Sequence, residues 1–235
     1  MRQNQRSRMN CDAIAPYYEV LEHLSFGRHL EQVRFAFLQE TRASRRAIVC
    51  GGGDGRFLAR LLRANPSVQV DFVDLSAKMI GLAEKRITGM GPAARRRVRF
   101  HAGDIREFAP GPVEYDLIVT HFFLDCFSDP ELCDVVGSLA DWAAPDVTWI
   151  VSDFRETQGP IGRIWTSGVT RGLYAAFRLT TGLRVTRLPQ YLPAIAEAGF
   201  RLRHEEKALG GLLHSSVWGR SLRRGEPAAA FQSSD

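Results

Sequence analysis

RAIVCGGGDGRFL, residues 46–58, joins a short apolar run to a loop with four glycines in five positions and then to a helical pattern. Glycine has no Cβ and accepts positive φ angles, so the backbone of such a loop can pass close to a ligand. The helix that follows presents unpaired N–H groups to the same place. The stretch predicts a β–α turn with a candidate binding site, although a tight turn of this composition can also bind nothing.

A second apolar run, Val70 to Val73, ends in Asp74, about 20 residues past the glycine loop. In nucleotide-binding βαβ units, an acid at this place accepts hydrogen bonds from ribose hydroxyls. Capping of the next helix is the alternative role for Asp74, but Ser76 is the better placed cap. We therefore predict that Asp74 binds a ribose.

The order of the glycines argues against a dinucleotide as the ligand. A dinucleotide fingerprint reads G-x-G-x-x-G, and its third glycine allows close packing of the helix on the strand. Gly51, Gly53 and Gly55 give G-x-G-x-G instead, and Arg56 stands where the third glycine would fall. A bound pyrophosphate is therefore disfavoured.

Four features, in this order, resemble the class I S-adenosylmethionine-dependent methyltransferases. They are the glycine loop after the first strand, the acid that ends the second strand, the turn Ala102 to Ile105 after the third strand, and the apolar fourth strand from Tyr115 to Thr120. The resemblance covers residues 45–155 well and the flanks loosely. It implies S-adenosyl-L-methionine as the cofactor. It also implies a Rossmann-like α/β fold: a doubly wound, mostly parallel, seven-stranded sheet with a C-terminal antiparallel hairpin and helices on both faces.

The same resemblance implies roles for single residues. The glycines would let the backbone approach the amino-acid end of the cofactor, Asp74 would hold the ribose, and Asp104 with Ile105 would bracket the adenine. An N-terminal helix that carries Tyr17 would fold over the cofactor. The complete implied cofactor-binding set is Gly51, Gly53, Asp54, Gly55, Asp74, Leu75, Asp104, Ile105, His121 and Tyr17.

Two other interpretations stay open. Many family members carry an acid two residues before the first glycine, where this chain has Val49. Its absence favours a catalytically silent subunit that keeps the cofactor fold and binds a partner. The loop Gly-Gly-Gly-Asp-Gly also resembles that of the polyamine aminopropyltransferases. Their fourth strand ends in an Asp-Ser-Ser-Asp-Pro type motif, which His121-Phe122-Phe123-Leu124-Asp125 replaces here.

Strands and helices alternate along the central part of the chain. Strands are expected at about 47–50, 69–74, 98–102, 115–121 and 147–153, and helices at about 12–43, 55–64, 76–88, 130–144, 160–182 and 188–198. A closing hairpin is expected at 200–207 and 212–218. This alternation predicts a parallel sheet that is covered on both faces and binds its ligand at the carboxyl ends of the strands. Asp74, Asp104, His121 and Asp153 fall at those ends.

We expect one domain with three parts. Residues 1–44 form an N-terminal helical lid, residues 45–220 the core with a helical insertion at about 156–198, and residues 221–235 a flexible tail. The arginine- and aromatic-bearing helix at 160–182 is interpreted as a substrate lid. Peripheral contact with an anionic membrane is its alternative role.

Methyl transfer from a sulfonium is an in-line displacement, to which a protein contributes alignment and a water-poor pocket. A base is needed only for a protonated acceptor. His121 is the candidate base because an imidazole titrates near neutrality, and Asp125 is the candidate to orient the acceptor or that histidine. Structural roles are the alternatives: a hydrogen-bonded residue at the strand end for His121, and a turn cap for Asp125. Asp153 is a similar candidate.

The aromatic residues near the expected site favour a small apolar or aromatic acceptor, although aromatic residues at such spacing also build cores. They are Tyr17, Tyr18, Phe122, Phe123, Phe127, Trp165 and Tyr174. The Asn/Asp-Pro-Pro-Tyr/Phe sequence used for amino methylation of bases and glutamine is absent. O, C, N and S acceptor atoms all stay open.

Composition sets outer limits on the function. The 235 residues, 45% hydrophobic and 24% charged, fit one globular domain with a net charge of +5. No nucleic-acid motif accompanies this modest charge, so no nucleic-acid partner is expected. The four cysteines form no C-x-x-C pair, and no tight carboxylate group suggests a metal. The polar N-terminus and the lack of a membrane-length apolar stretch predict a cytoplasmic protein. The sequence makes no prediction of the oligomeric state.

Overall fold

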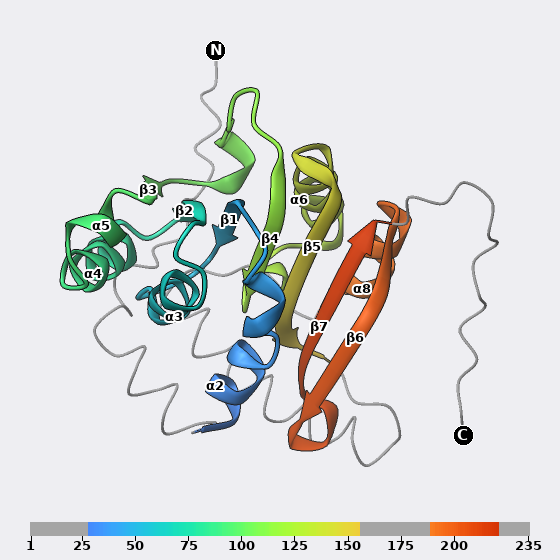
Figure 1. The fold of residues 1–235 in the computed structure, drawn as a ribbon. Helices are drawn as coiled ribbons and strands as arrows, with labels where there is room; N and C mark the ends of the chain where they lie inside the picture. Colours follow the sequence, from blue (N-terminus) through green and yellow to red (C-terminus); the bar gives the residue numbers. More distant parts are fainter. Residues whose placement is uncertain (1–27, 156–188, 221–235) are drawn as a thin grey trace, which may run out of the picture.

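Seven strands form one mixed sheet at the centre of the protein (Figure 1). The computed structural model describes residues 28–155 and 189–220. The strands are β1 (Arg46–Cys50), β2 (Gln69–Asp74), β3 (Val98–Ala102), β4 (Tyr115–His121), β5 (Ala143–Phe154), β6 (Phe200–Ala208) and β7 (Leu213–Arg220). Their order is β3-β2-β1-β4-β5-β7-β6, with β7 antiparallel to both of its neighbours and every other pair parallel. The predicted Rossmann-like sheet with its C-terminal antiparallel hairpin is thereby confirmed.

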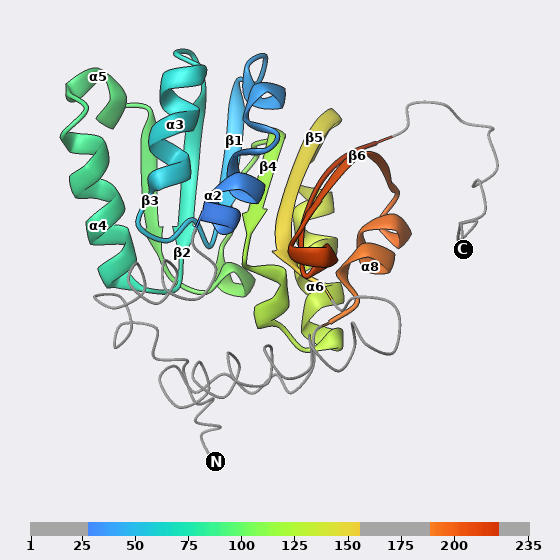
Figure 2. The same ribbon diagram turned by 90° about the horizontal axis from the view of Figure 1, so that it is seen from below.

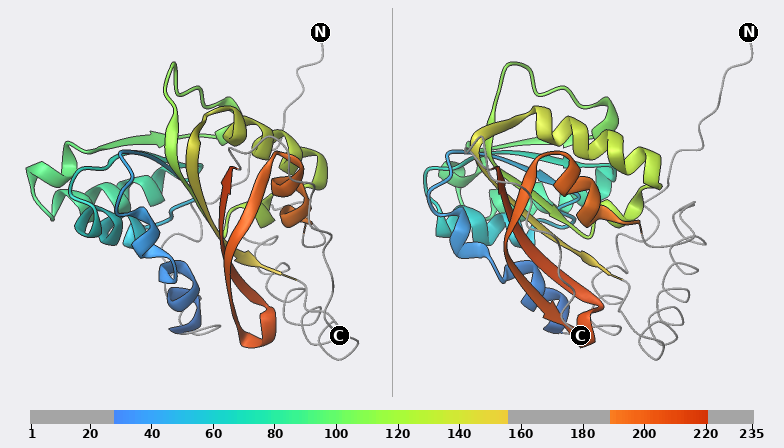
Figure 3. Two further views of the ribbon diagram at one scale, coloured as in Figure 1. Left: turned by 45° about the vertical axis from the view of Figure 1, so that its right-hand side comes forward. Right: turned by 90° about the vertical axis from the view of Figure 1, so that its right-hand side faces the viewer.

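Helices cover both faces of this sheet, which explains why the central strands β1 and β4 are buried along most of their length. The helices α3 (Arg56–Ala64) and α4 (Ala77–Thr88) contact each other on one face, and the short α5 (Pro92–Arg95) follows α4 (Figure 2). The helices α6 (Asp129–Asp141) and α8 (Tyr191–Glu197) contact each other on the opposite face (Figure 1). Figure 3 shows the β6–β7 hairpin with α8 beside it.

Two helix starts use the caps that their sequences favour. The Ser76 side chain accepts a hydrogen bond of 3.2 Å from the Met79 N–H at the start of α4, as predicted. Ser128 and Glu131 form a capping box at the start of α6. These caps fix where each helix leaves the carboxyl edge of the sheet.

The N-terminal helix differs from the prediction. Within the described residues, α2 (Arg28–Phe35) ends at Phe35, and a separate 3-10 turn follows at Leu38–Thr41. The helix expected over residues 12–43, with an interruption near residues 25–27, therefore does not extend unbroken from there to residue 43. Asn65 fixes the end of this segment. Its buried side-chain amide donates hydrogen bonds of 2.7 Å to the carbonyls of Thr41 and Ser44, which holds residues 41–44 out of a helix.

The boundary between α6 and β5 also differs from the prediction. The helix ends at Asp141 instead of 144, and β5 begins at Ala143 instead of 147. Ala143 pairs with Tyr115 of β4, and its carbonyl accepts a hydrogen bond of 3.2 Å from Arg220. Both contacts come from distant segments, and they draw Ala143 into the sheet.

Several predictions concern residues that the structure does not describe. Tyr17 and Tyr18, the helix at 160–182, the first 27 residues of the lid and the tail at 221–235 lie outside the described residues. The division into lid, core, insertion and tail stays a prediction. In residues 28–155 and 189–220, no helix combines the length and the apolar character that crossing a membrane requires.

Candidate active site

The glycine loop passes from β1 to α3 at the carboxyl edge of the sheet. Gly51, Gly53 and Gly55 have φ angles of +65°, +57° and +80°, which residues with a Cβ rarely adopt. A Cβ on Gly51 would lie 2.6 Å from Phe123 Cδ2, and one on Gly55 would lie 2.8 Å from Ala83 Cβ. A Cβ on Gly53 would meet no heavy atom within 4 Å. Packing therefore fixes the outer two glycines, whereas Gly53 leaves an open cradle that a ligand can enter.

Asp74 stands beside this cradle at the end of β2. Its Oδ2 accepts a hydrogen bond of 3.1 Å from the Gly53 N–H, and its Oδ1 accepts one of 2.9 Å from the Ser76 N–H. A carboxylate has about four lone-pair positions, so it can accept hydrogen bonds from several donors at once. Leu75 is half-buried between Asp74 and the cap of α4. The geometry fits a ligand that approaches the loop backbone and offers hydroxyl groups to Asp74.

Asp54 in the same loop faces the groove between α3 and α4. Its carboxylate pairs with Arg56 Nε at 3.2 Å and with an Arg86 nitrogen at 2.7 Å, and its carbonyl accepts from Arg86 Nε at 2.9 Å. These contacts tie the loop to both helices. The predicted part of Asp54 in cofactor binding stays a prediction.

Asp104 and Ile105 lie where the end of β3 meets the end of β2. The Gly103 N–H donates a hydrogen bond of 3.0 Å to the Asp74 carbonyl, which joins the two strand ends. The Asp104 carboxylate accepts a hydrogen bond of 3.0 Å from the Arg106 N–H and pairs with the Arg106 guanidinium, whose pKa it raises. Ile105 is buried. Their adenine-binding role stays a prediction.

His121 ends β4 on the face that carries α3. It is 4% exposed. The Phe57 ring packs edge-on against the imidazole, with 4.5 Å between the two ring centroids. Its Nε2 is the one buried side-chain nitrogen or oxygen in the described part of the chain that has no hydrogen-bond partner. Burial, followed by the nearby Arg34, holds the pKa of His121 well below its ordinary value, so the ring is neutral at pH 7. With Arg34 and the glycine loop, His121 lines a cavity of about 20 Å³.

Asp125 and Asp153 meet on the opposite face of the sheet. Asp153 is fully buried and accepts backbone hydrogen bonds of 3.0 Å from Leu124, 3.2 Å from Asp125 and 3.0 Å from Phe154. The carboxyl groups of Asp125 and Asp153 are hydrogen-bonded to each other. Burial first, and Asp125 second, raise the pKa of Asp153 well above its ordinary value, so the pair retains a proton. Asp153 therefore caps the turn at Leu124–Cys126, the role that the sequence had suggested for Asp125.

A series of hydrogen-bonded polar side chains lies next to this carboxyl pair, and the sequence analysis did not predict it. His214 is the register partner of Asp153 across β5 and β7. Its Nδ1 lies 3.2 Å from the hydroxyl of Tyr191, and its Nε2 lies 3.1 Å from Glu205 Oε2. The polar run His-Ser-Ser inside the otherwise apolar β7 was the available signal, because buried polar residues need partners. Within the described ranges, no three His, Cys, Asp or Glu side chains gather as a metal site.

Known proteins share parts of this sequence and fold. Residues 48–148 match the family described as a methyltransferase domain. Malonyl-[acyl-carrier protein] O-methyltransferase of Halalkalibacterium halodurans is 27% identical over 146 residues, which are 60% of this chain and 51% of that protein. Polyamine aminopropyltransferase 2 of Bacillus anthracis is 34% identical over 83 residues, which are 33% of this chain and 23% of that protein.

A solved structure, that of the mitomycin 7-O-methyltransferase MmcR, superposes with a TM-score of 0.62 at 16% identity. The superposition covers 86% of this chain and 57% of that chain. It shows a shared fold. The chain spans about half the length of the first curated relative and less of the second.

Proposed function

We propose that this chain, which matches a methyltransferase domain over residues 48–148, is a class I S-adenosylmethionine-dependent methyltransferase that transfers a methyl group from S-adenosyl-L-methionine to a small-molecule acceptor. One observation carries the proposal. Gly53 opens a cradle at the end of β1, and its N–H donates to Asp74 at the end of β2, 3.1 Å away. Loop backbone and carboxylate thus lie at the carboxyl edge of a parallel sheet, where such sheets bind ligands.

The residues around the cradle suit the parts of this cofactor. Asp74 would accept hydrogen bonds from the ribose hydroxyls, and the loop backbone at Gly51 and Gly53 would approach the amino-acid end. Asp104 and the buried Ile105 would flank the adenine. When bound, the cofactor supplies an electrophilic methyl group on a positively charged sulfur. The chain contributes orientation and exclusion of water.

We further propose a small apolar or aromatic acceptor. Aromatic side chains gather just after β4: Phe123 and Phe127 lie 5.1 Å apart, and Phe122 and Phe154 lie 5.3 Å apart, centroid to centroid. The names of two compared proteins, a mitomycin 7-O-methyltransferase and a malonyl-[acyl-carrier protein] O-methyltransferase, make methyl transfer to oxygen the first reaction to test. His121 is the proposed base for a protonated acceptor, and Asp125, on the opposite face of the sheet, is the proposed residue to orient the acceptor.

Calorimetric titration with S-adenosyl-L-methionine and S-adenosylhomocysteine tests the cofactor. Hydrogen bonds to a carboxylate are worth about 1.5–3 kcal/mol, so Asp74→Ala is expected to weaken binding by about tenfold or more. Asp116→Ala is the matched control. Asp116 also accepts two backbone N–H groups, from Arg45 at 2.8 Å and Arg46 at 2.9 Å, but at the amino end of β4. Its loss is expected to leave affinity unchanged. Failure of the wild-type chain to bind either ligand would remove the proposal.

Release of S-adenosylhomocysteine in the presence of small aromatic acceptors then tests the reaction. Cofactor binding without turnover on any acceptor would favour the silent partner subunit. An aminopropyltransferase-like reaction is the second candidate, supported by the Gly-Gly-Gly-Asp-Gly loop and the local likeness to polyamine aminopropyltransferase 2. Tighter binding of decarboxylated S-adenosylmethionine, with release of methylthioadenosine, would favour that candidate.

A further inference from the structure

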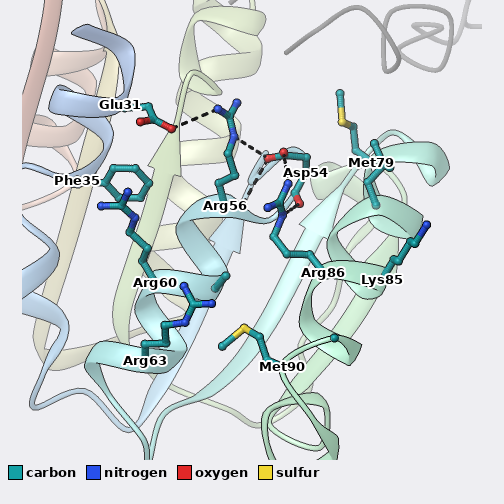
Figure 4. Close-up of a pocket in the computed structure, with 13 residues that line it drawn as sticks. Glu31, Phe35, Asp54, Arg56, Arg60, Arg63, Met79, Lys85, Arg86 and Met90 are labelled. Carbon is teal, nitrogen blue, oxygen red and sulfur yellow. Dashed lines mark hydrogen bonds and ion pairs between the residues drawn. The ribbon is translucent and has the colours of Figure 1, made fainter. Parts of the chain in front are cut away.

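A groove of about 660 Å³ runs between α3 and α4, beside the end of α2 (Figure 4). Five basic side chains line it and face two carboxylates, Glu31 and Asp54. The basic residues are Arg56, Arg60, Arg63, Lys85 and Arg86. This surplus of positive charge stands out in a chain whose overall balance of charge is modest.

The two carboxylates are already occupied by two of the cations. Arg56 pairs with Asp54 at 3.2 Å and with Glu31 at 3.4 Å, and Arg86 pairs with Asp54 at 2.7 Å. The Arg60 guanidinium lies over the ring of Phe35, 4.0 Å from its centroid, and stays exposed.

The remaining two cations carry the unbalanced charge. Arg63 and Lys85 are exposed and form no ion pair within the described part of the chain. With Arg60, they leave three positive charges on the rims of the groove that no carboxylate offsets. A ligand of this groove must therefore be acidic.

The shape of the groove indicates what kind of acidic ligand fits. Figure 4 shows Arg56, Arg60 and Arg63 on successive turns of α3, with Lys85 on the α4 side. At 1.5 Å per residue, the three arginines extend over about 10 Å. They form a row and do not converge on one point, as the cations around a single phosphate would.

Apolar side chains also line the groove. Phe35, Met79, Leu82 and Met90 line the groove, and Leu82 is 44% exposed, which is unusual among the large apolar residues that the structure describes. A groove lined by both apolar and unbalanced basic side chains complements a helix that carries apolar and acidic residues. We propose that the α3–α4 groove docks an acidic amphipathic helix of a partner protein. The proposal does not depend on the proposed reaction.

Fluorescence anisotropy with a synthetic helix tests the proposal. The probe is a labelled peptide with Leu on one face and Glu on the other, and a scrambled peptide of the same composition is its control. Arg60→Glu with Arg63→Glu is expected to weaken binding of the probe by more than about tenfold. Arg56 and Arg86 are left unchanged because they hold the glycine loop through Asp54.

Charge reversal at Arg42 and Arg96 is the matched control. Both arginines are exposed and lie outside the groove, so binding is expected to stay within about twofold of wild type. If the groove double variant melts at a lower temperature, Arg60→Gln with Arg63→Gln replaces it.

Four outcomes would overturn the proposal. They are no binding of the probe to wild type, equal binding of the scrambled peptide, equal loss in the control double variant, and unchanged binding in the groove variant. Groove-dependent binding of phosphatidylglycerol vesicles or duplex DNA in place of the probe would also overturn it, because the groove would then recognise a polyanion and not an acidic helix.

Discussion

The Gly53 N–H donates a hydrogen bond of 3.1 Å to Asp74 Oδ2, which joins the loop after β1 to the end of β2 across 21 residues of sequence. The bond forms with Gly53 in the left-handed region, at a φ of +57°. One residue thus serves the loop conformation and the orientation of the ribose-binding candidate together. A substitution at Gly53 is therefore expected to have two effects, one on stability and one on ligand binding, which can be measured separately.

Gly53→Ala is predicted to abolish cofactor binding and to cost about 1–2 kcal/mol of stability, the penalty for an alanine in left-handed backbone. Gly111→Ala is the matched control. Gly111 also has a positive φ, +74°, and a Cβ there would meet no atom within 4 Å, but it lies in the loop before β4. Urea unfolding should give similar losses for both variants, and calorimetry should find lost binding only for Gly53→Ala. Wild-type affinity in Gly53→Ala would contradict the cradle.

The Asp125–Asp153 pair predicts a pH dependence of stability. The pKa of Asp153 is raised, so above about pH 4 the native state keeps a proton that the unfolded chain releases. The free energy of unfolding therefore falls as pH rises from about 4 towards the raised pKa. Asp125→Asn removes the neighbouring charge and is expected to flatten this fall. Urea unfolding between about pH 5 and 8 measures it.

Asp146→Asn controls for the loss of any one carboxylate, because Asp146 is exposed and lies at the far end of β5. This variant should keep the wild-type pH dependence. A wild-type slope in Asp125→Asn as well would mean that burial alone, without the Asp125 carboxylate, raises the pKa of Asp153.

His121 predicts a loss of stability on the acid side. Its pKa is lowered in the native state, so below about pH 6.5 the unfolded chain binds a proton that the folded chain does not. The contribution of neutral His121 to the free energy of unfolding is fully present above that pH. It decreases below that pH, by at most about 1.4 kcal/mol per pH unit. His121→Gln should remove this part of the slope. His214, whose pKa is also lowered, chiefly by burial, should keep its own part.

The exposed His204 provides the comparison for His121. His204→Gln is expected to leave the acid slope of wild type unchanged in the same unfolding experiments. If His121→Gln also kept that slope, the ring would have to be protonated in the native state, and its burial against Phe57 would not control its charge.

Much of the sheet was predictable because its strands are bounded by local signals. β2, β3 and β4 have the predicted residues, since each is bounded by a turn or by a polar residue at the carboxyl edge. The start of β5 was not predictable. Ala143 is equally suited to a helix, and only its pairing with Tyr115, far away in sequence, makes it a strand residue.

The candidate site divides in the same way. Asp74 and the glycines carry a local pattern of order and spacing, so the sequence singles them out. The pairing of Asp54 with Arg86 carries no local pattern in the sequence. It joins residues 32 positions apart, and it depends on how α3 and α4 pack. The meeting of Asp125 with Asp153 depends on the adjacency of β4 and β5, and the link from Tyr191 to His214 depends on where α8 packs.

Asp71 predicts a stability effect that is independent of the candidate site. It is 2% exposed and accepts hydrogen bonds from Arg99 at 2.6 and 2.8 Å and from the Tyr115 hydroxyl at 3.0 Å, while His101 Nε2 lies 2.8 Å away. Burial raises the pKa of Asp71, but the hydrogen bonds outweigh burial and lower it. The charged form is therefore stabilising above about pH 4, and that contribution disappears as pH falls below this value.

Asp71→Asn is expected to cost about 1–3 kcal/mol at pH 7, because it weakens three charge-assisted contacts and places an amide N–H₂ against donors. Cofactor affinity should not change, since Asp71 lies inside β2 and away from its carboxyl end. Asp141→Asn, at an exposed carboxylate, should stay within about 0.5 kcal/mol of wild type. Urea unfolding gives the energies and calorimetry the affinities. Equal stability of Asp71→Asn and wild type would mean that solvent replaces the network at no cost.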